Sequence, residues 1–358
     1  MKKYDLVIVR DDAIGDFFIW IDTLKAYEEK YKGKKVLLIC DTNISEVAMG
    51  SDFFTEVISY TKKDVMKSPS KFFLLLKNTK KIEAKEVLYP IWTHHLIGCL
   101  IVMSIKSKRK IGMTCKFVDK GYSVRTIFKK FFDKHIIESI DISDDLNEIK
   151  AIEYFTQRVT VRTYKYGYNK LEPKGEIKGL DDKYVLVSLS SSVDYKIWNM
   201  SRFAMLINMI PRSYVVVLSG VGDGDMKRAS EIKKLVDNSV RLIDMVNKTS
   251  VKEMVLLISK AVFVIGNDSA AVHIAAATHV PSVCLLHGAQ FGRFLPYPTD
   301  LPFPYFCPRP VYFKMDCYGC NFHCTLIKNG SYECLDKVTV EMAGRELKKL
   351  INEIECHE

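Results

Sequence analysis

Short apolar segments alternate with amphipathic segments along almost the whole chain. In the first half, segments 5–9, 35–40 and 84–88 have the length and composition of buried strands, and 17–30 has the apolar spacing of a helix. The alternation restarts at 184–189 and continues toward the end of the chain. Parallel strands require long, usually helical crossovers, so this order predicts α/β domains built on parallel sheets.

The chain has 358 residues, which is too many for one ordinary hydrophobic core. Segment 163–183 has no clear period and contains Pro173, Gly175 and Gly179, so the two alternating regions meet there. We predict two doubly wound domains, which bind ligands at the carboxyl ends of their strands. The predicted bounds are an N-terminal domain over 1–170, a linker over 171–183, a C-terminal domain over 184–337 with a Cys-rich loop at 315–335, and a final helix over 338–358.

Positive charge is concentrated in one segment. The net charge is +10, and residues 61–140 hold 18 Lys and Arg against 6 Asp and Glu. Such a segment attracts phosphate-bearing partners. It lacks the interleaved aromatic residues of a single-strand groove, so we expect no nucleic acid as a partner. The apolar run 96–105 is too short to span a membrane, and 1–10 has the pattern of a strand and not of a signal peptide, so we expect a cytoplasmic protein.

One strand-to-helix junction has the features of a ligand site. The apolar strand 261–265 stops at the polar turn 266–269, and a helix of small residues follows. The first N–H groups of a helix have no partner within the helix, so they can bind an anion. Asp268 or Ser269 can cap that helix, and the alternative interpretation is a tightly packed, capped turn without a ligand.

Two further polar segments follow predicted first strands. Segment 10–16 ends in Gly15, which permits a tight loop, and Asp16, which either accepts a proton from a hydroxyl group or caps a helix starting near Phe17. Segment 190–198 carries serines and Lys196, which suit a diphosphate, although a Ser-rich turn with a solvated lysine has the same composition.

These motifs together resemble glycosyltransferase family 9, the heptosyltransferase-like enzymes of bacterial lipopolysaccharide synthesis. The matching elements, in order, are the Gly15-Asp16 pair, the Ser191-Ser192 pair with Lys196-x-Trp198, the Asp268-Ser269-Ala270-x-x-His273 signature, and the element His287-Gly288 through Arg293-Phe-Leu-Pro-Tyr-Pro298. Ala270 stands where the family has glycine, which indicates an altered donor geometry.

The resemblance implies a GT-B fold, with two Rossmann-like doubly wound domains facing a central cleft. It implies inverting, metal-independent transfer of a heptose or related sugar from a nucleotide-sugar donor to a cell-surface glycan or lipopolysaccharide precursor. Asp16 would be the catalytic base in the acceptor-side first domain. The residues expected to bind the donor or its diphosphate are Arg10, Gly15, Ser191, Ser192, Lys196, Asp244, Asp268, Ser269, Ala270 and His273.

Four cysteines cluster near the C-terminus, at Cys317, Cys320, Cys324 and Cys334. Their spacing suits a structural zinc site, with His323 as a substitute ligand. The alternatives are an iron–sulfur cluster and a buried, metal-free thiol cluster, because spacing alone does not define ligand geometry.

The basic segment leaves other functions open. With Trp92, His94 and His95 it predicts peripheral contact with the anionic inner membrane surface, where a lipid-linked or lipopolysaccharide-type acceptor would lie. The alternatives are a GT-B-fold sugar-nucleotide epimerase, or a non-catalytic basic scaffold that binds nucleic acid or membrane.

Overall fold

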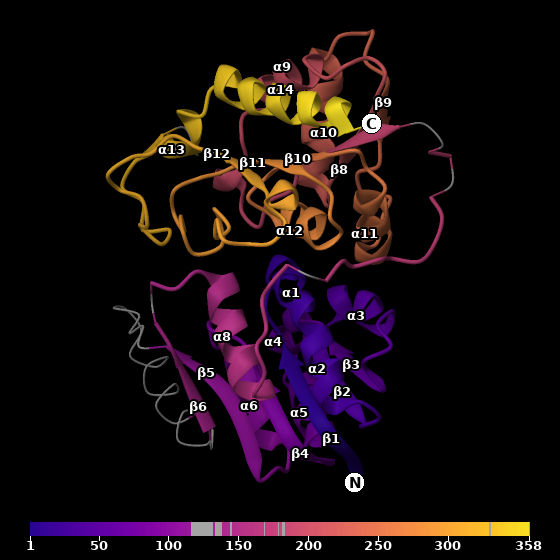
Figure 1. Cartoon of the computed structure of the whole chain (residues 1–358), viewed down its shortest axis with the longest axis vertical. Coiled ribbons are helices and arrows are strands. Elements are labelled where there is room, and N and C mark those ends of the chain that lie inside the picture. The colour runs from indigo at the N-terminus through magenta and orange to yellow at the C-terminus, as the bar shows by residue number, and fades with distance from the viewer. Residues whose placement is uncertain are drawn as a thin grey trace. The chain divides into compact units, whose positions relative to one another are not determined.

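The computed structural model describes residues 1–115, 132, 138–143, 145–167, 169–177, 179–180, 183–328 and 331–357. The chain divides into two compact units, Met1–Tyr166 and Gly167–Glu358. Each unit is a parallel sheet covered by helices (Figure 1).

The first unit contains a six-stranded parallel sheet with the order β3-β2-β1-β4-β5-β6. Its strands are β1 (Lys2–Arg10), β2 (Val36–Asp41), β3 (Glu56–Tyr60), β4 (Ile82–Tyr89), β5 (Arg109–Cys115) and β6 (Glu138–Ile142). Its described helices are α1 (Ile14–Trp20), a 3₁₀ turn (Ile21–Thr23), α2 (Leu24–Tyr31), α3 (Thr42–Met49), α4 (Lys62–Lys67), α5 (Pro69–Thr79), α6 (Leu96–Ser104) and α8 (Glu148–Thr160). This is the strand order of dinucleotide-binding folds.

The second unit repeats that order, because its sheet runs β12-β11-β10-β7-β8-β9. Its strands are β7 (Tyr184–Ser188), β8 (Val215–Ser219), β9 (Leu242–Asp244), β10 (Val264–Asn267), β11 (Ser282–Leu285) and β12 (Arg309–Val311), with a separate hairpin of β13 (Ile327–Lys328) and β14 (Ser331–Tyr332). Its helices are 3₁₀ turns at Asp194–Lys196 and Pro304–Phe306, α9 (Met200–Asn208), α10 (Asp223–Leu235), α11 (Val251–Ser259), α12 (Ala270–Ala277), α13 (Glu333–Asp336) and α14 (Val340–His357).

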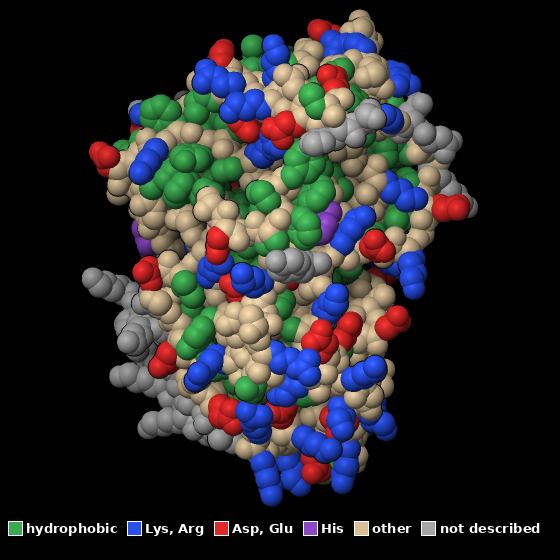
Figure 2. Space-filling view, in the orientation of Figure 1, with side chains coloured by type: hydrophobic (Ala, Val, Ile, Leu, Met, Phe, Trp, Pro, Cys, Tyr) green, Lys and Arg blue, Asp and Glu red, His purple; other side chains and the backbone are tan. Residues whose placement is uncertain are grey.

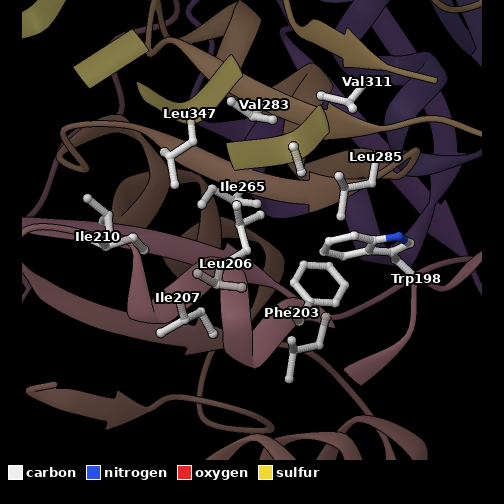
Figure 3. Packing of buried hydrophobic residues seen from close by; sticks show 14 of the residues in the cluster. Trp198, Phe203, Leu206, Ile207, Ile210, Ile265, Val283, Leu285, Val311 and Leu347 are labelled. Atoms are coloured by element: carbon white, nitrogen blue, oxygen red, sulfur yellow. The ribbon is translucent and has the colours of Figure 1, made fainter. Parts of the chain in front are cut away.

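The core of the second unit forms between its sheet and the helices α9 and α14. Trp198 and Phe203 lie edge to face, with ring centroids 5.3 Å apart, and they pack toward Leu285 of β11 (Figure 3). Leu347 of α14 completes the same cluster. The predicted final helix is therefore part of the second unit's core, which it enters through one apolar face.

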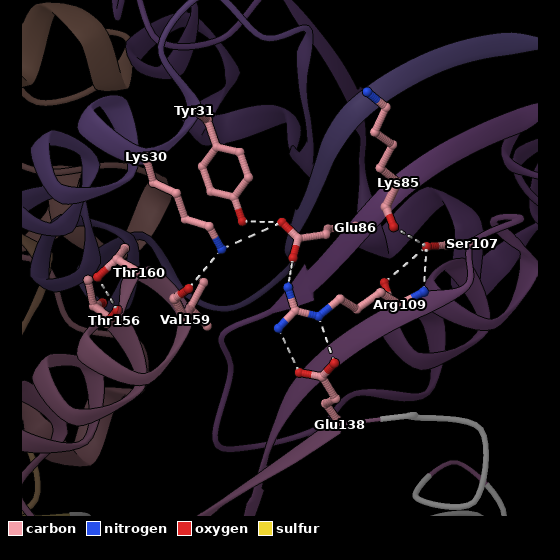
Figure 4. Close-up of polar contacts among 10 residues, drawn as sticks. All are labelled: Lys30, Tyr31, Lys85, Glu86, Ser107, Arg109, Glu138, Thr156, Val159 and Thr160. Atoms are coloured by element: carbon pink, nitrogen blue, oxygen red, sulfur yellow. Dashed lines mark hydrogen bonds and ion pairs between the residues drawn. The ribbon is translucent and has the colours of Figure 1, made fainter. Parts of the chain in front are cut away.

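Ion pairs join β4, β5 and β6 in the first unit. Arg109 of β5 contacts Glu86 of β4, and its Nε lies 2.6 Å from Glu138 of β6 (Figure 4). Tyr31 of α2 donates its hydroxyl to Glu86, and Lys30 donates to the carbonyl of Val159 in α8 at 2.8 Å. Part of the positive charge of segment 61–140, that of Arg109, is thus neutralised by acidic residues of the same unit.

The predicted α/β class is confirmed, and the alternating pattern located most elements. It missed β6 and α8 in the first unit and the three-residue edge strand β12 in the second. The helix expected to start near Phe17 starts at Ile14 and is interrupted by the 3₁₀ turn Ile21–Thr23. The cleft between the domains stays a prediction. Within the described residues, no helix combines the length and apolar character needed to cross a bilayer.

Candidate active site

Asp16 lies in the first turn of α1, directly after the loop that leaves β1. Its carboxylate accepts the backbone N–H of Ala13 at 3.4 Å, so it satisfies a helix-start donor from inside the helix and not from the expected cap position. Gly15 precedes it within the same turn. Both residues follow the carboxyl end of a central strand, where α/β folds bind ligands.

The Asp16 loop is held by Arg10, the last residue of β1. Arg10 is fully buried, and its guanidinium donates to the carbonyls of Pro90 and Asp16 and pairs with Asp12. It also lies 5.1 Å from the ring centroid of Trp20. These contacts hold the guanidinium inside the first unit, and the expected contact between Arg10 and a diphosphate stays a prediction.

Several charges share the surroundings of Asp16. Burial, together with the negative charges of Asp12 and Glu148, raises the pKa of Asp16 to about 8, while Arg10 opposes the shift. Burial likewise raises the pKa of Asp12 to about 6 against the favourable charge of Arg10. A carboxylate with a pKa near neutrality is a stronger base than an ordinary one, which suits proton abstraction.

In the second unit, the buried side-chain hydroxyls of Ser191 and Ser269 have no hydrogen-bond partner among the described residues. Ser191 follows β7, and Ser269 precedes α12 at the N-cap position, at the carboxyl ends of adjacent strands. The expectation that Ser269 caps α12 is therefore wrong, since its side chain makes no capping bond. Unpaired buried hydroxyls are costly, and a polar ligand would satisfy them.

A buried charge cluster lies beside these hydroxyls. Lys196 is only 8% exposed and stabilises the ionised form of Asp268. Nε2 of His287 lies 3.1 Å from Asp268, and Nδ1 of His287 accepts the N–H of Ala289 at 3.0 Å. With Nδ1 accepting, a neutral His287 carries its proton on Nε2, facing the carboxylate. Burial opposes ionisation of Asp268, but His287 and Lys196 together hold the pKa of this carboxyl below its ordinary value.

His273 lies in α12 with a buried side chain. Its Nδ1 lies 2.8 Å from the hydroxyl of Tyr297, and the two rings stack. Burial lowers the pKa of His273 to about 4, so the ring is neutral at physiological pH. The predicted residue is therefore a hydrogen-bonding and packing group and not a cation.

The remaining predicted donor residues differ in their surroundings. Ser192 is exposed, and Ala270 begins α12. Asp244 ends β9, where it pairs with Lys233 and accepts the N–H of Val246 at 2.9 Å. Burial opposes the shift, but the contact with Lys233 holds the pKa of Asp244 below its ordinary value. Asp244 thus already has partners on its own unit, whereas Ser191 and Ser269 do not.

The four clustered cysteines converge, since Cys317, Cys320, Cys324 and Cys334 line one cavity. Within the described part of the chain, however, no group of three or more His, Cys, Asp or Glu side chains is arranged to hold a metal ion. Sγ of Cys334 instead accepts the N–H of Gly288 at 3.3 Å. The predicted structural zinc is therefore not supported.

Sequence reasoning missed several residues around Asp16 in the first unit and around Asp268 in the second. Asp12 and Glu148 flank Asp16, and His287, Tyr297 and Phe322 surround the second cluster. His287 begins one of the motifs that resemble the family, so the sequence could have indicated it as a site residue. Phe322 carried none, because it reaches the cluster only through the folding of the Cys-rich loop.

Comparison with known proteins places the chain in a family. The profile of glycosyltransferase family 9 (heptosyltransferase) matches residues 96–300, which is more than half of the chain. The chain belongs to glycosyltransferase family 9. Lipopolysaccharide heptosyltransferase 3 of Escherichia coli (strain K12) is 27% identical to it over 219 residues, covering 58% of this chain and 61% of the relative. The match therefore spans less than two thirds of that relative's length.

Solved structures of family 9 agree in fold. A family 9 glycosyltransferase from Veillonella parvula DSM 2008 matches with a TM-score of 0.74 and 17% identity, over 98% of both chains. Escherichia coli heptosyltransferase WaaC, solved with ADP-2-deoxy-2-fluoro heptose, matches with a TM-score of 0.68 and 13% identity, over 97% of this chain and 99% of that one. The expected GT-B fold, with two Rossmann-like domains, is thus confirmed.

Proposed function

We propose that this family 9 member is an inverting, metal-independent glycosyltransferase that moves a heptose or related sugar from an ADP-linked donor to a lipopolysaccharide-type acceptor. The observation that carries the proposal is Asp16, a carboxyl at the end of a central strand with a pKa raised to about 8. Asp16 would take the proton of an acceptor hydroxyl. The resulting oxygen forms a bond to the anomeric carbon while the bond to the diphosphate breaks, which inverts the configuration.

The second unit supports the donor half of the proposal. Lys196 and the N-terminus of α12 would neutralise the leaving diphosphate, and Ser191 and Ser269 would donate their unpaired hydroxyls to it. Asp268 would bind the sugar through its ionised carboxylate. Because Lys196 supplies positive charge at the diphosphate, the reaction proposed here uses no metal ion.

A nucleotide screen tests the donor assignment. In a thermal-shift experiment, ADP and ADP-heptose should raise the melting temperature, whereas GDP, UDP and dTDP should not. No shift with any of the four nucleotides would exclude the proposed donor site. Incubation with ADP-heptose alone tests the epimerase alternative, since an isomerised product without acceptor would favour that activity.

Asp16→Asn should lower the transfer rate by a factor of about 10² or more, because the amide cannot accept the proton. The ADP-induced thermal shift should be retained, since Asp16 lies outside the second unit. Glu29→Gln is the control, because Glu29 is an exposed acid of the same unit paired with Arg162 on the surface. Unchanged turnover of Asp16→Asn would exclude the base role.

We further propose that the helices α4 and α5 contact the anionic inner membrane surface on its cytoplasmic side. Met66, Phe73 and Leu74 are 76%, 68% and 56% exposed there. The exposed lysines around them are Lys63, Lys67, Lys71, Lys77, Lys80 and Lys81. Figure 2 shows Lys and Arg side chains gathered over the part of the first unit where β1 begins. Apolar side chains ringed by lysines suit an interface with anionic head groups.

His94, another residue of the basic segment, lies among aromatic rings of the first unit. The ring of His94 packs against Tyr89 and Phe132 at centroid distances of 5.2 and 5.1 Å. These ring contacts do not involve the exposed side chains of α4 and α5, which are the ones proposed to meet the membrane.

A vesicle experiment tests this surface. The protein should sediment with vesicles of phosphatidylglycerol and not with phosphatidylcholine alone. Replacing Phe73 and Leu74 by serine should weaken sedimentation about tenfold, since two exposed apolar side chains no longer enter the interface. Met205→Ser, at an exposed residue of the second unit, is the control. Equal binding to both lipids would exclude an electrostatic contact.

A further inference from the structure

The Cys-rich segment lies directly along the loop that carries His287. The N–H of Gly319 donates to the carbonyl of Gly288 at 2.9 Å, and the N–H of Asn321 donates to the carbonyl of Ala289 at 2.8 Å. A Cβ on Gly288 would lie 2.2 Å from the ring of Tyr318, so only glycine permits this approach. The segment is thus fixed against the residues that position Asp268.

The backbone at the tip of this segment is unusual. Asn321 and Phe322 have φ values of 46° and 66°, and are consecutive non-glycine residues in the left-handed region. This conformation is unfavourable for a bulky residue and persists only where surrounding contacts hold it. The ring of Phe322, which this backbone carries, lies at the charge cluster.

The ring of Phe322 meets Lys196 at that cluster. The ammonium of Lys196 lies 4.6 Å from the ring centroid, and the imidazole of His287 lies 5.9 Å from it on another side. Lys196 is buried, so its attraction to the aromatic face is screened less than it would be in water. Lysine has a long, flexible side chain, and an aromatic face restricts where its charge resides.

We propose that Phe322 is a positioning residue of the donor site, holding the ammonium of Lys196 where the diphosphate of a nucleotide binds. The Cys-rich segment is then a part of the donor site and does more than pin the chain before α14. This inference rests on the proposed function, because it assigns Lys196 to the diphosphate.

Packing alone is the competing explanation. Phe322 packs against the apolar core of the second unit, so its loss could loosen the unit without any effect specific to Lys196. The two explanations differ in one respect. A positioning role acts through the charge of Lys196 and disappears when that charge is removed, whereas a packing role does not.

A double-mutant cycle separates them. The four proteins are wild type, Phe322→Leu, Lys196→Met and the double variant, and Leu keeps a Cβ so that the backbone strain is unchanged. Affinity for ADP is measured by calorimetry. Phe322→Leu should weaken ADP binding about 3- to 10-fold in wild type and less than about 2-fold in the Lys196→Met background. Binding of adenosine, which lacks the diphosphate, should not change.

The control is Phe313→Leu. Phe313 covers Lys337 at 5.3 Å in the same region, so its replacement removes a similar contact away from the cluster. It should leave ADP affinity unchanged. Phe322→Tyr should behave as wild type, because it retains the aromatic face.

Thermal melting of the four proteins without ligand measures the Lys196–Phe322 contact itself. An equal loss of ADP affinity in both backgrounds, or an absence of coupling in the melting cycle, would overturn the inference. A different outcome is that wild type binds no nucleoside diphosphate but the melting cycle shows coupling. The proposed function and the positioning role then both fail, and only the contact between Lys196 and Phe322 is supported. If wild type binds ADP and Phe322→Leu binds it equally, only the inference fails.

Discussion

Asp16 is a residue on which two opposing effects act. A carboxylate in the first turn of a helix is stabilised by the helix dipole, at most by about 2 kcal/mol, which would lower its pKa. Burial and the neighbouring acids Asp12 and Glu148 act in the other direction, and they dominate because the pKa is raised to about 8. The balance follows from the arrangement around the residue and not from its place in the helix.

This balance predicts a pH dependence. Only ionised Asp16 can take a proton, so kcat/KM for the acceptor should rise with pH through about 8. Asp12→Asn removes a negative charge and leaves Arg10 uncompensated, and both changes lower the pKa of Asp16. The rising limb should therefore move to lower pH by about one unit. The profile is measured from about pH 6 to pH 9.5, where the protonation state of Asp16 changes most.

The surface variant Glu29→Gln is the control for this profile and should not move the rising limb. A limb that stays in place in Asp12→Asn, or moves to higher pH, would contradict the assigned cause of the raised pKa. Loss of all activity in Asp12→Asn is distinguished from a shift by the thermal stability of the variant.

At the scale of elements, the strands β4, β5 and β6 depend on shared charges. Glu86 is 13% exposed and receives contacts from Arg109, Tyr31 and Lys30. Removing its charge leaves Lys30 and Arg109 without the anion that they share, so that Lys30 keeps the carbonyl of Val159 and Arg109 keeps Glu138. Surface ion pairs, by contrast, contribute little.

We expect Glu86→Gln to lower the free energy of unfolding by about 1–3 kcal/mol, because Lys30 and Arg109 lose the negative charge that they share at this partly buried position. Arg162→Ala is the matched comparison, since Arg162 and Glu29 form a pair in which both side chains are more than half exposed. It should cost less than about 1 kcal/mol. Urea denaturation followed by tryptophan fluorescence measures both, and equal costs would show that the network is only a surface feature.

Elements were predicted from the sequence to different degrees. The predicted strands 35–40 and 184–189 correspond to β2 (Val36–Asp41) and β7 (Tyr184–Ser188), with bounds that differ by one residue at most. The pattern is clear there, because each strand is a short, continuous run of buried residues. β12 (Arg309–Val311) was missed, since a three-residue edge strand containing proline carries almost no periodic signal.

At the scale of the whole molecule, the two units have separate sheets and separate hydrophobic clusters. The proposed donor residues Ser191, Lys196, Asp268 and Ser269 all belong to the second unit, whereas Asp16 belongs to the first. The proposal thus assigns donor binding to the second unit and base catalysis to the first.

This division predicts where a nucleotide acts. ADP should slow hydrogen exchange in peptides covering 186–198 and 264–289, because binding stabilises the segments that it contacts. Peptides covering β1 and α1 should exchange as in the free protein. Exchange measured by mass spectrometry on the full chain checks this, and protection confined to the first unit would contradict the assignment of the donor.

The sequence by itself determined the class of the fold and the polar residues at the carboxyl ends of the strands. Both depend on local patterns: the spacing of apolar residues, and the residue types that follow each strand. Asp16, Ser191, Lys196 and Asp268 could be named on that basis.

Only the tertiary structure decided how those residues are surrounded. It buried Arg10 with Asp12, raised the pKa of Asp16, left Ser269 unpaired and brought Phe322 onto Lys196. It also placed four cysteines around one cavity without a metal-binding arrangement among the described residues. Burial and contacts between segments far apart in the chain arise from packing, and no local pattern of residues encodes them.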